Sequence, residues 1–183
     1  MIITVAGLPG SGKSTLAKGL AKKLGFTHHS TGDIWRKIAK ERNLTPLELN
    51  KLAEKAQEID REVDRGTVEL AKQEDNFVMD SRMAWHFIPD CVKIFVEVDL
   101  EKAAERIFKD MRSEEKENTS VEKTYEHLHK RMESEKKRYK ELYNVDYQDR
   151  SNYDLVLNST HDPIEETLAN ALEFLQKKGF TKH

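Results

Sequence analysis

The chain has 183 residues, of which 37% are hydrophobic and 35% charged, and its formal net charge is −2. That length suits one domain with a sizeable core, and the near-neutral charge gives no reason to expect a nucleic-acid partner. No apolar run approaches the roughly 18 residues of a membrane span, and the one cysteine cannot form an intramolecular disulfide, which fits a reducing compartment. We therefore expect one cytoplasmic domain, residues 1–183, with neither a nucleic-acid nor a membrane partner.

An apolar segment, Ile2–Ala6, leads directly into a glycine-rich turn and the start of a helix. The turn fits the pattern G-x-x-x-x-G-K-[ST] of a phosphate-binding loop: Gly7-Leu8-Pro9-Gly10-Ser11-Gly12-Lys13-Ser14-Thr15. Glycines let the backbone curl with its N–H groups pointing inward, so that they meet phosphate oxygens. Lys13 can reach the β- and γ-phosphates, and the Ser14 hydroxyl can ligate Mg²⁺. An ordinary glycine turn is the weaker alternative, and we predict that these nine residues bind a nucleoside triphosphate.

Further apolar runs follow, with helical patterns between them. They are Phe26–His29, which is the weakest, Phe77–Asp80, Val92–Val98 and Tyr153–Leu157. Strands that alternate with helices are typical of a parallel sheet covered by helices on both faces. Together with the phosphate loop, this order predicts an α/β protein of the P-loop NTPase type, with three layers and a five-stranded parallel sheet.

Several helix starts carry capping signals. Capping boxes are predicted at Thr45-Pro46-Leu47-Glu48 and at Thr119-Ser120-Val121-Glu122, and Asp162-Pro163 begins the last helix. Two helical stretches, 33–75 and 101–143, contain no strand pattern. In a phosphate-loop protein such excursions are candidates for covers that close over the site.

A second polar segment, Ser30-Thr31-Gly32-Asp33-Ile34-Trp35-Arg36, follows the second predicted strand. Ligands bind at strand ends in open parallel sheets. We expect Thr31 or Asp33 to cap the following helix, which puts Arg36 one turn in, at a place suited to a second anion. An ordinary helix cap followed by a surface arginine is an equally good interpretation of this segment taken alone.

A phosphate loop followed by Ser-Thr-Gly-Asp-x-x-Arg resembles the nucleoside monophosphate kinases. In that family the Ser/Thr and Arg side chains hold the phosphate of the acceptor nucleotide. The resemblance therefore implies an acceptor site at Ser30, Thr31, Asp33 and Arg36. It also implies that residues 33–75 form a small helical domain that closes over the acceptor, here named the acceptor segment, and that residues 101–143 form the lid segment.

Another polar cluster, Asp80-Ser81-Arg82, directly follows the strand that ends at Asp80. A carboxylate at this strand end can hold Mg²⁺ through water, beside the phosphate loop. The run is similar to the Gly-Arg-x-Ala pattern of cytidylate kinases, especially their short archaeal-type form, with Ser81 in place of the glycine. In that branch the arginine contacts the monophosphate, which implies the same role for Arg82.

A charged residue interrupts the apolar stripe of the helix predicted from about 119 to 143. Glu135 falls in the apolar register, and Arg131 and Arg138 share its face. In an anonymous helix we would favour an intrahelical ion-pair ladder, worth roughly a few tenths of a kcal/mol when exposed. The pattern R-x-x-x-[DE]-x-x-R resembles the closing segment of cytidylate kinases. This implies that Arg131 and Arg138 clamp the phosphates and that Glu135 touches the acceptor's sugar.

The same resemblance places a lid arginine, Arg106, near the phosphates of the donor. A second arginine usually stands next to it, where this chain has Ile107. We therefore expect Lys109 or Arg112 to substitute for it.

Two aspartates, Asp60 and Asp64, are four residues apart and face the same way on a predicted helix. The element Ile-Asp-x-x-Val/Ile-Asp is similar to one in the acceptor domain of archaeal-type cytidylate kinases. A carboxylate that accepts from the exocyclic amine of cytosine is sensible chemistry. The alternative is a solvated helix face on which these aspartates pair with Arg61 or Arg65.

The resemblance covers almost the whole chain, and it implies a monomeric kinase that moves the γ-phosphate of ATP, with Mg²⁺, to CMP or dCMP. A monophosphate oxygen is already anionic, so no general base is needed, and catalysis depends on positioning and charge neutralisation. The donor adenine is expected at the turn Asn158-Ser159-Thr160-His161. The alternatives are an adenylate kinase, a metabolite kinase with Asp33 as base, and a nucleotide-binding switch that transfers no phosphate.

Overall fold

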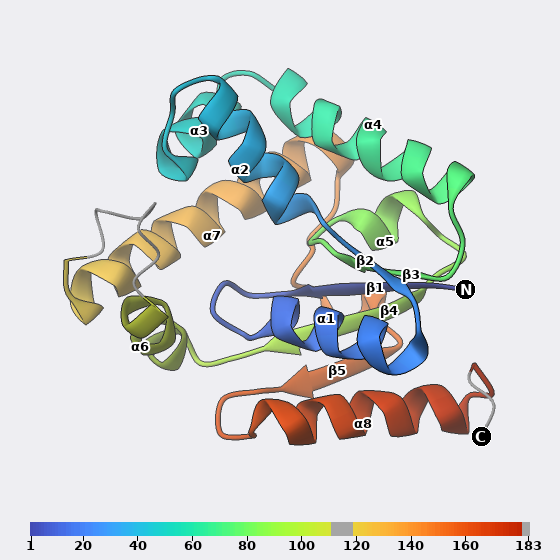
Figure 1. The fold of residues 1–183 in the computed structure, drawn as a ribbon. Coiled ribbons are helices and arrows are strands. Elements are labelled where there is room, and N and C mark those ends of the chain that lie inside the picture. The colour runs from blue at the N-terminus through green and yellow to red at the C-terminus, as the bar shows by residue number, and fades with distance from the viewer. Residues whose placement is uncertain (111–118, 181–183) are drawn as a thin grey trace.

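The computed structural model describes residues 1–110 and 119–180, and a parallel sheet forms the centre of this part (Figure 1). The sheet contains β1 (Ile2–Gly7), β2 (Thr27–Ser30), β3 (Phe77–Asp80), β4 (Val92–Glu97) and β5 (Leu155–Asn158). Its order is β2-β3-β1-β4-β5, and each neighbouring pair is parallel. The predicted α/β fold with a five-stranded parallel sheet is confirmed for the described residues.

Helices cover both faces of the sheet. Helices α1 (Lys13–Leu24) and α8 (Ile164–Lys177) lie on one face, where they bury the apolar stripe that their sequences carry. The other face is covered by α5 (Ala84–Phe87), by the end of α4 (Glu58–Gln73) and by the segment after α7, which includes a 3-10 turn at Arg150–Asn152. The central strands β1, β3 and β4 are rich in apolar residues because both of their faces are covered, whereas the edge strand β2 is polar and only partly buried.

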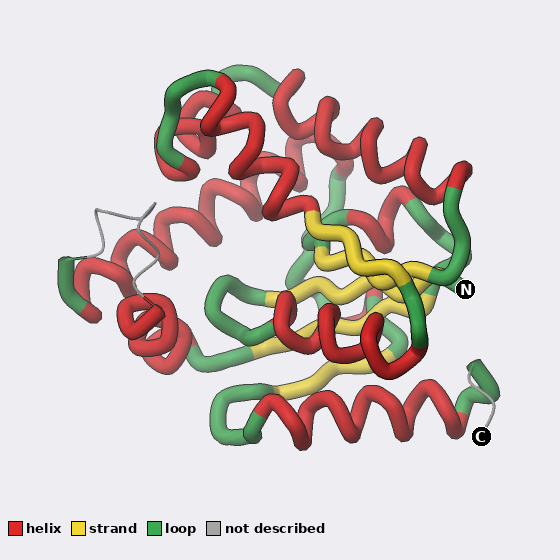
Figure 2. Tube along the Cα trace, in the orientation of Figure 1, coloured by secondary structure: helices red, strands yellow, loops and turns green. Residues whose placement is uncertain are grey.

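Most of the two helical excursions lies beyond the carboxyl edge of the sheet, whereas α4 runs back along the sheet towards its amino edge (Figure 2). The acceptor segment comprises α2 (Thr31–Glu41), α3 (Pro46–Ala53) and α4, which share a hydrophobic cluster of their own. The lid segment contains α6 (Leu100–Asp110) and α7 (Val121–Tyr143), which pack together through another cluster. Each segment thus has a hydrophobic cluster of its own, and α4 also packs against the sheet through Leu70 and Ala71.

One predicted capping box is confirmed and the other is displaced by one residue. Thr45 Oγ1 accepts from the Glu48 amide at 3.1 Å while Glu48 Oε2 accepts from the Thr45 amide at 2.7 Å. Helix α7 is capped by Ser120, whose Oγ accepts from the Lys123 amide at 3.2 Å. A lysine at the third helical position cannot accept in return, so this cap has no reciprocal bond.

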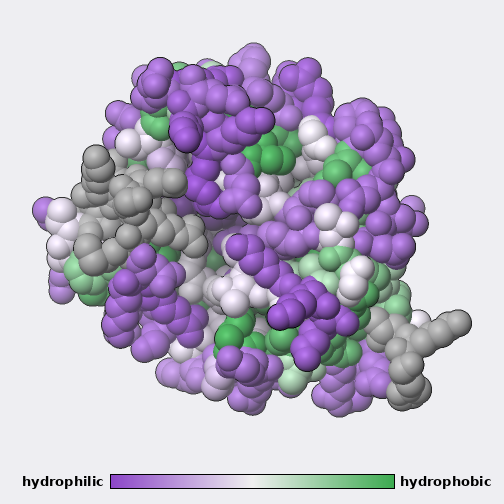
Figure 3. Space-filling view, in the orientation of Figure 1, coloured by the Kyte–Doolittle hydropathy of each residue, from purple (hydrophilic) through white to green (hydrophobic). Residues whose placement is uncertain are grey.

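The described helices include none that is long and apolar enough to cross a membrane. The face shown in Figure 3 is mostly hydrophilic, with small hydrophobic patches.

Two glycines with the same backbone conformation have different surroundings. Gly10 in the phosphate loop has φ +72°, and a Cβ placed there lies 2.9 Å from backbone atoms of Ala103 in α6. Gly25, after α1, has φ +69° and nothing within 4 Å of that position. We expect Gly25→Ala to lower the free energy of unfolding by about 1 kcal/mol through left-handed strain alone. Gly10→Ala should cost more and also weaken ATP binding, because the loop must move away from α6.

Urea unfolding and calorimetric ATP titration of both variants test this expectation. Equal stability losses with unchanged ATP affinity would contradict it, because they would show that the contact between Gly10 and α6 does not constrain the loop.

Candidate active site

The phosphate loop connects β1 to α1 through three glycines, of which Gly7 and Gly10 leave no room for a Cβ. A Cβ at Gly7 would lie 2.3 Å from the carbonyl oxygen of Val96 in the neighbouring strand. Gly12 occupies the N-cap of α1 with φ +79°, and no side chain caps the helix. The first turn of α1 carries no acidic residue. The loop therefore directs an uncapped helix N-terminus towards a prospective anion.

Positive charge surrounds the start of α1. The pKa of Lys13 is lowered to about 8, mainly by burial and then by the charges of Arg82 and Arg131, while Asp80 and Glu135 act in the opposite direction. Three cations thus share the site with two carboxylates, and little water screens them. The phosphates of a nucleotide would supply the missing negative charge.

The residues predicted to hold Mg²⁺ lie at this end of the sheet. Ser14 is in the first turn of α1, and Asp80 ends β3 with 4% of its surface exposed. The Ser30 hydroxyl donates to Asp80 Oδ2 at 3.4 Å. Mg²⁺ is commonly held by one or two protein oxygens together with substrate phosphates, and a hydroxyl and a carboxylate are oxygen donors of that kind. The Ser14 hydroxyl and the Asp80 carboxylate therefore fit Mg²⁺.

Glu135 joins two arginines that are distant in sequence. Its Oε1 accepts from Arg131 Nε at 3.0 Å, and its Oε2 lies 2.8 Å from Arg82 Nε in an ion pair whose direction departs from that of a hydrogen bond. The Glu135 side chain is only 4% exposed. Burial by itself raises the pKa of Glu135, but Arg82 and Arg131 outweigh it and leave the pKa below its ordinary value. Glu135, the charged residue in the apolar register of α7, therefore lies at the centre of a tertiary cluster. An ion-pair ladder within α7 does not account for its contact with Arg82.

Arg138, predicted to clamp phosphates with Arg131, lies against the acceptor segment. Its Nε donates to Asp60 Oδ2 of α4 at 3.0 Å, and both side chains are buried. Burial raises the pKa of Asp60, and the charge of Arg138 opposes that rise. The structure thus brings Arg82, Arg131 and Glu135 together and holds Arg138 beside them in a second buried pair.

Asp64 lies one helical turn after Asp60 and accepts a hydrogen bond from the Tyr143 hydroxyl of α7. Both predicted aspartates therefore have partners on α7. The alternative pairing with neighbouring arginines does not occur for Arg61, whose described hydrogen bond goes to Gln57. No spacing rule pointed to Tyr143, because the contact joins two helices that are far apart in sequence.

The segment after β2 differs from its predicted capping. Helix α2 begins at Thr31 and its N-cap is Ser30, which makes no side-chain capping bond. Neither Thr31 nor Asp33 caps the helix. Thr31 Oγ1 instead donates to the carbonyl oxygen of Asp80 at 3.3 Å, and Asp33 pairs with Arg36 within the first turn. These residues do lie at the carboxyl end of β2, beside Asp80, as predicted for an acceptor site.

Arg106 connects the phosphate loop to the turn predicted to hold adenine. Its Nη2 donates to the Ser159 carbonyl oxygen at 2.6 Å, and its Nη1 lies 3.5 Å from the Gly10 carbonyl oxygen. Ser159 Oγ donates to the Ser11 carbonyl oxygen at 2.8 Å. Of the two substitutes for the second lid arginine, Lys109 is exposed near the end of α6 and Arg112 lies outside the described residues.

Ser81 and Trp85 fix the backbone around Arg82, a function that the sequence pattern did not reveal. Ser81 Oγ accepts from the amides of Met83 and Ala84 at 3.3 and 3.1 Å. The Trp85 indole donates to the Arg82 carbonyl oxygen at 2.8 Å. Ser81, which replaces the glycine of the family pattern, therefore caps the turn that carries Arg82.

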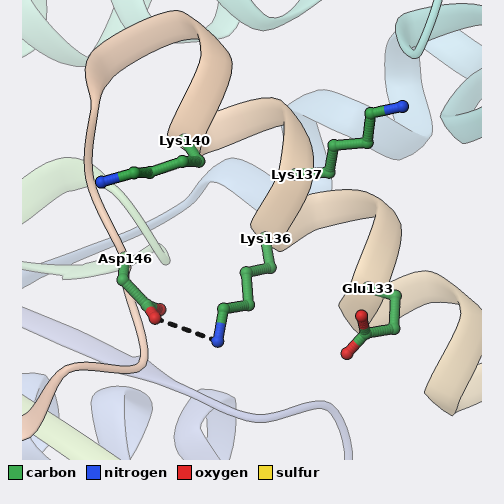
Figure 4. A pocket seen from close by; sticks show the side chains of 5 residues that line it. All are labelled: Glu133, Lys136, Lys137, Lys140 and Asp146. Carbon is green, nitrogen blue, oxygen red and sulfur yellow. Dashed lines mark ion pairs between the residues drawn. The ribbon is translucent and has the colours of Figure 1, made fainter.

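A hollow of about 380 Å³ lies on another side of α7 (Figure 4). It is lined by Glu133, Lys136, Lys137, Lys140 and Asp146. An ion pair of 3.0 Å between Lys136 and Asp146 joins α7 to the segment that follows it. None of the predicted site residues lines this hollow, so it is not part of the candidate active site.

The pair between Asp64 and Tyr143 predicts a pH-dependent stability. Burial raises the pKa of Asp64 from 3.8 to about 6, partly offset by the Tyr143 hydrogen bond. The resulting stabilisation is present below pH 3.8 and is lost as the pH rises through about 6. We expect Asp64→Asn to match the wild type at pH 4 and to exceed it at pH 8 by up to about 3 kcal/mol in free energy of unfolding.

Urea unfolding of both proteins between pH 4 and 8 measures this difference. Tyr143→Phe is a second test. Loss of the Tyr143 hydroxyl should raise the pKa of Asp64 further, so that the free energy of unfolding should depend more steeply on pH. A stability difference between Asp64→Asn and the wild type that stays constant with pH would refute the expectation.

Comparison with known proteins agrees with this geometry. A family described as "AAA domain" matches residues 3–149. A protein named cytidylate kinase from Natronomonas pharaonis is 45% identical over 87% of this chain and 81% of its own length. Another of that name, from Methanocaldococcus jannaschii, is 40% identical over 97% of this chain and 100% of its own.

Solved structures share the fold at low sequence identity. A shikimate kinase from Bacteroides thetaiotaomicron matches with a TM-score of 0.70 and 16% identity, covering 96% of this chain and 98% of that one. Such a match shows the fold alone. On the sequence matches, the chain belongs to the AAA domain family and to the cytidylate kinases.

Proposed function

We propose that this chain transfers the γ-phosphate of ATP, with Mg²⁺, to CMP or dCMP. The observation that carries the proposal is the cluster of Arg82 and Arg131 around the buried Glu135, beside Lys13. This cluster belongs to a chain that is 45% identical to a protein named cytidylate kinase. Residues 1–183 act as one kinase domain, with the acceptor segment and the lid segment as its covers.

The reaction needs charge neutralisation more than proton transfer. The attacking oxygen of a monophosphate is already anionic near neutral pH, and the transferring phosphoryl group spreads negative charge over its oxygens. Lys13, Arg82 and Arg131 meet that charge in a site with little water, where electrostatic interactions are strong. Glu135 holds both arginines through their Nε atoms, so their terminal nitrogens face the phosphates without reorganisation.

The donor nucleotide is held by the phosphate loop, with its adenine at the turn that Arg106 contacts. Ser14 and Asp80 would hold Mg²⁺, which supplies further neutralisation of the donor phosphates when bound. Ser30, Thr31 and Arg36, at the end of β2, bind the acceptor phosphate. Closure of both covers excludes water, which would otherwise accept the phosphoryl group.

The chain acts as a monomer, because both covers need free space to close, and its single cysteine fits the reducing cytoplasm. Light scattering after size-exclusion chromatography tests the monomer.

ADP release from ATP-Mg²⁺ tests the activity, with CMP, dCMP, UMP, AMP, GMP and TMP supplied separately and with one sample that lacks an acceptor. Strong rates with CMP or dCMP, and a low rate without acceptor, are expected. Turnover confined to AMP would favour an adenylate kinase instead. Absence of ADP release with every monophosphate, in a protein that still binds ATP, would overturn the proposal. A metabolite kinase or a nucleotide-binding switch would then remain.

A further inference from the structure

Arg138 is held by three side chains, from α3, α4 and α7. A guanidinium has five N–H donors. Its Nε donates to Asp60 at 3.0 Å, and its Nη1 donates to Asn50 Oδ1 at 2.8 Å and to Ser134 Oγ at 3.0 Å. Among residues 1–110 and 119–180, no hydrogen bond is recorded from Nη2. Three donors are thus bound to protein, and the Nη2 edge remains for a ligand.

Asn50 and Ser134, which both accept from Arg138, are also hydrogen-bonded to each other. Asn50 Nδ2 donates to Ser134 Oγ at 3.2 Å, and Ser134 Oγ donates to Glu54 Oε1 at 2.5 Å. Asn50 lies on α3 and is 6% exposed, whereas Ser134 lies on α7. A buried amide is costly unless both of its ends are bonded, and here both ends have partners. The contact of Asn50 with Ser134 and Arg138 therefore joins α3 of the acceptor segment to α7.

The plane of the guanidinium is also defined. Asp60 contacts only the Nε side and would by itself leave the plane free to tilt. Asn50 and Ser134 hold Nη1, and the Trp35 ring lies 5.7 Å from Cζ. An arginine held in this way loses less conformational freedom when it binds an anion.

We propose that Asn50, together with Ser134, is a positioning residue for the acceptor nucleotide. It orients Arg138 so that the Nη2 edge faces the phosphate of the bound monophosphate. The inference rests on the proposed function. It adds a residue that no motif singled out, and it makes the contact between α3 and α7 part of acceptor recognition.

Steady-state kinetics of Asn50→Leu test the proposal, with CMP and ATP varied separately. Leucine has a similar size and no polar atom. We expect the KM for CMP to rise about tenfold, as for loss of one charged hydrogen bond, and the KM for ATP to stay within about twofold. Lys51→Leu, an exposed neighbour on α3, is the matched control and should change neither KM.

Two further variants separate positioning from a structural effect. Ser134→Ala should raise the KM for CMP in the same direction as Asn50→Leu, and it tests the proposal if Asn50→Leu fails to fold. In an Arg138→Lys background, Asn50→Leu should cause no additional rise, because the oriented group is gone. A purely structural role would give additive effects, and it would lower the melting temperature without a selective change in the KM for CMP.

The results that overturn this inference differ from those that overturn the proposed function. Wild-type turnover of CMP, together with an unchanged KM for CMP in both Asn50→Leu and Ser134→Ala, refutes the positioning role alone. Equal increases in both KM values, or additive effects with Arg138→Lys, refute it as well. Absence of wild-type turnover with every monophosphate overturns the proposed function and this inference together.

Discussion

Replacing Arg82 with methionine is expected to lower kcat with CMP about 10³-fold and to leave the dissociation constant for ATP within about threefold of the wild-type value. Methionine keeps an unbranched side chain but removes the charge. The Arg82 side chain is 14% exposed and lies beside Glu135 at the end of β3. The proposed function has Arg82 act on the transferring phosphoryl group, whereas ATP retains the phosphate loop and Lys13.

Initial rates of ADP release and calorimetric ATP titration measure the two quantities. Arg42→Met is the matched control, because Arg42 is an exposed arginine that pairs with Glu62 on the surface. It should leave both quantities unchanged. If Arg82→Met kept kcat within tenfold of the wild type, Arg82 would not be a catalytic residue; a switch that transfers no phosphate would show no turnover in the wild type either.

The second large effect is expected for Glu135→Gln, which keeps the shape of the side chain and removes its charge. Arg82, Arg131 and Lys13 then lose the buried anion that they share. We expect the free energy of unfolding at pH 7 to fall by about 3 kcal/mol, as when one partner of a buried ion pair is removed. The kcat should also fall, because neither arginine is held in place.

The pH dependence of this loss of stability follows from the direction in which the pKa of Glu135 is shifted. The pKa of Glu135 in the folded protein lies below its ordinary value of 4.5. Its stabilisation is therefore present above pH 4.5 and is lost as the pH falls through the lower, folded-state pKa. The stability difference between wild type and Glu135→Gln should be largest near neutral pH and shrink in acid.

Urea unfolding over that pH range, with Glu133→Gln as control, tests the expectation. Glu133 is exposed on the same helix, two residues earlier, and its loss should cost little. Added pyrophosphate should stabilise Glu135→Gln more than the wild type, because it supplies the missing negative charge. Equal stability of Glu135→Gln and wild type at pH 7 would show that Glu135 does not hold the cluster together.

Local patterns predicted the parts of the fold that depend on few neighbouring residues. The phosphate loop was recognisable because its glycines, Lys13 and Ser14 stand at spacings that only a phosphate cradle requires. The central strands were recognisable because a strand buried on both faces is a continuous apolar run, and β2, which is polar, gave the weakest signal. The start of α3 directly after Thr45 followed from one capping box. The cap of α7 was misplaced by one residue, because Thr119 and Ser120 are equally good caps in sequence.

The sequence by itself thus determined the sheet, the phosphate loop and the residue types that line the strand ends, because these depend on periodicity and fixed spacing. Only the tertiary structure decided the partners: Glu135 with Arg82, Arg138 with Asp60 and Asn50, and Asp64 with Tyr143. A buried asparagine or tyrosine has no periodic signature, and its partner depends on how α3 and α4 pack against α7. Charge pairing across helices is a property of that packing, and no local pattern encodes it.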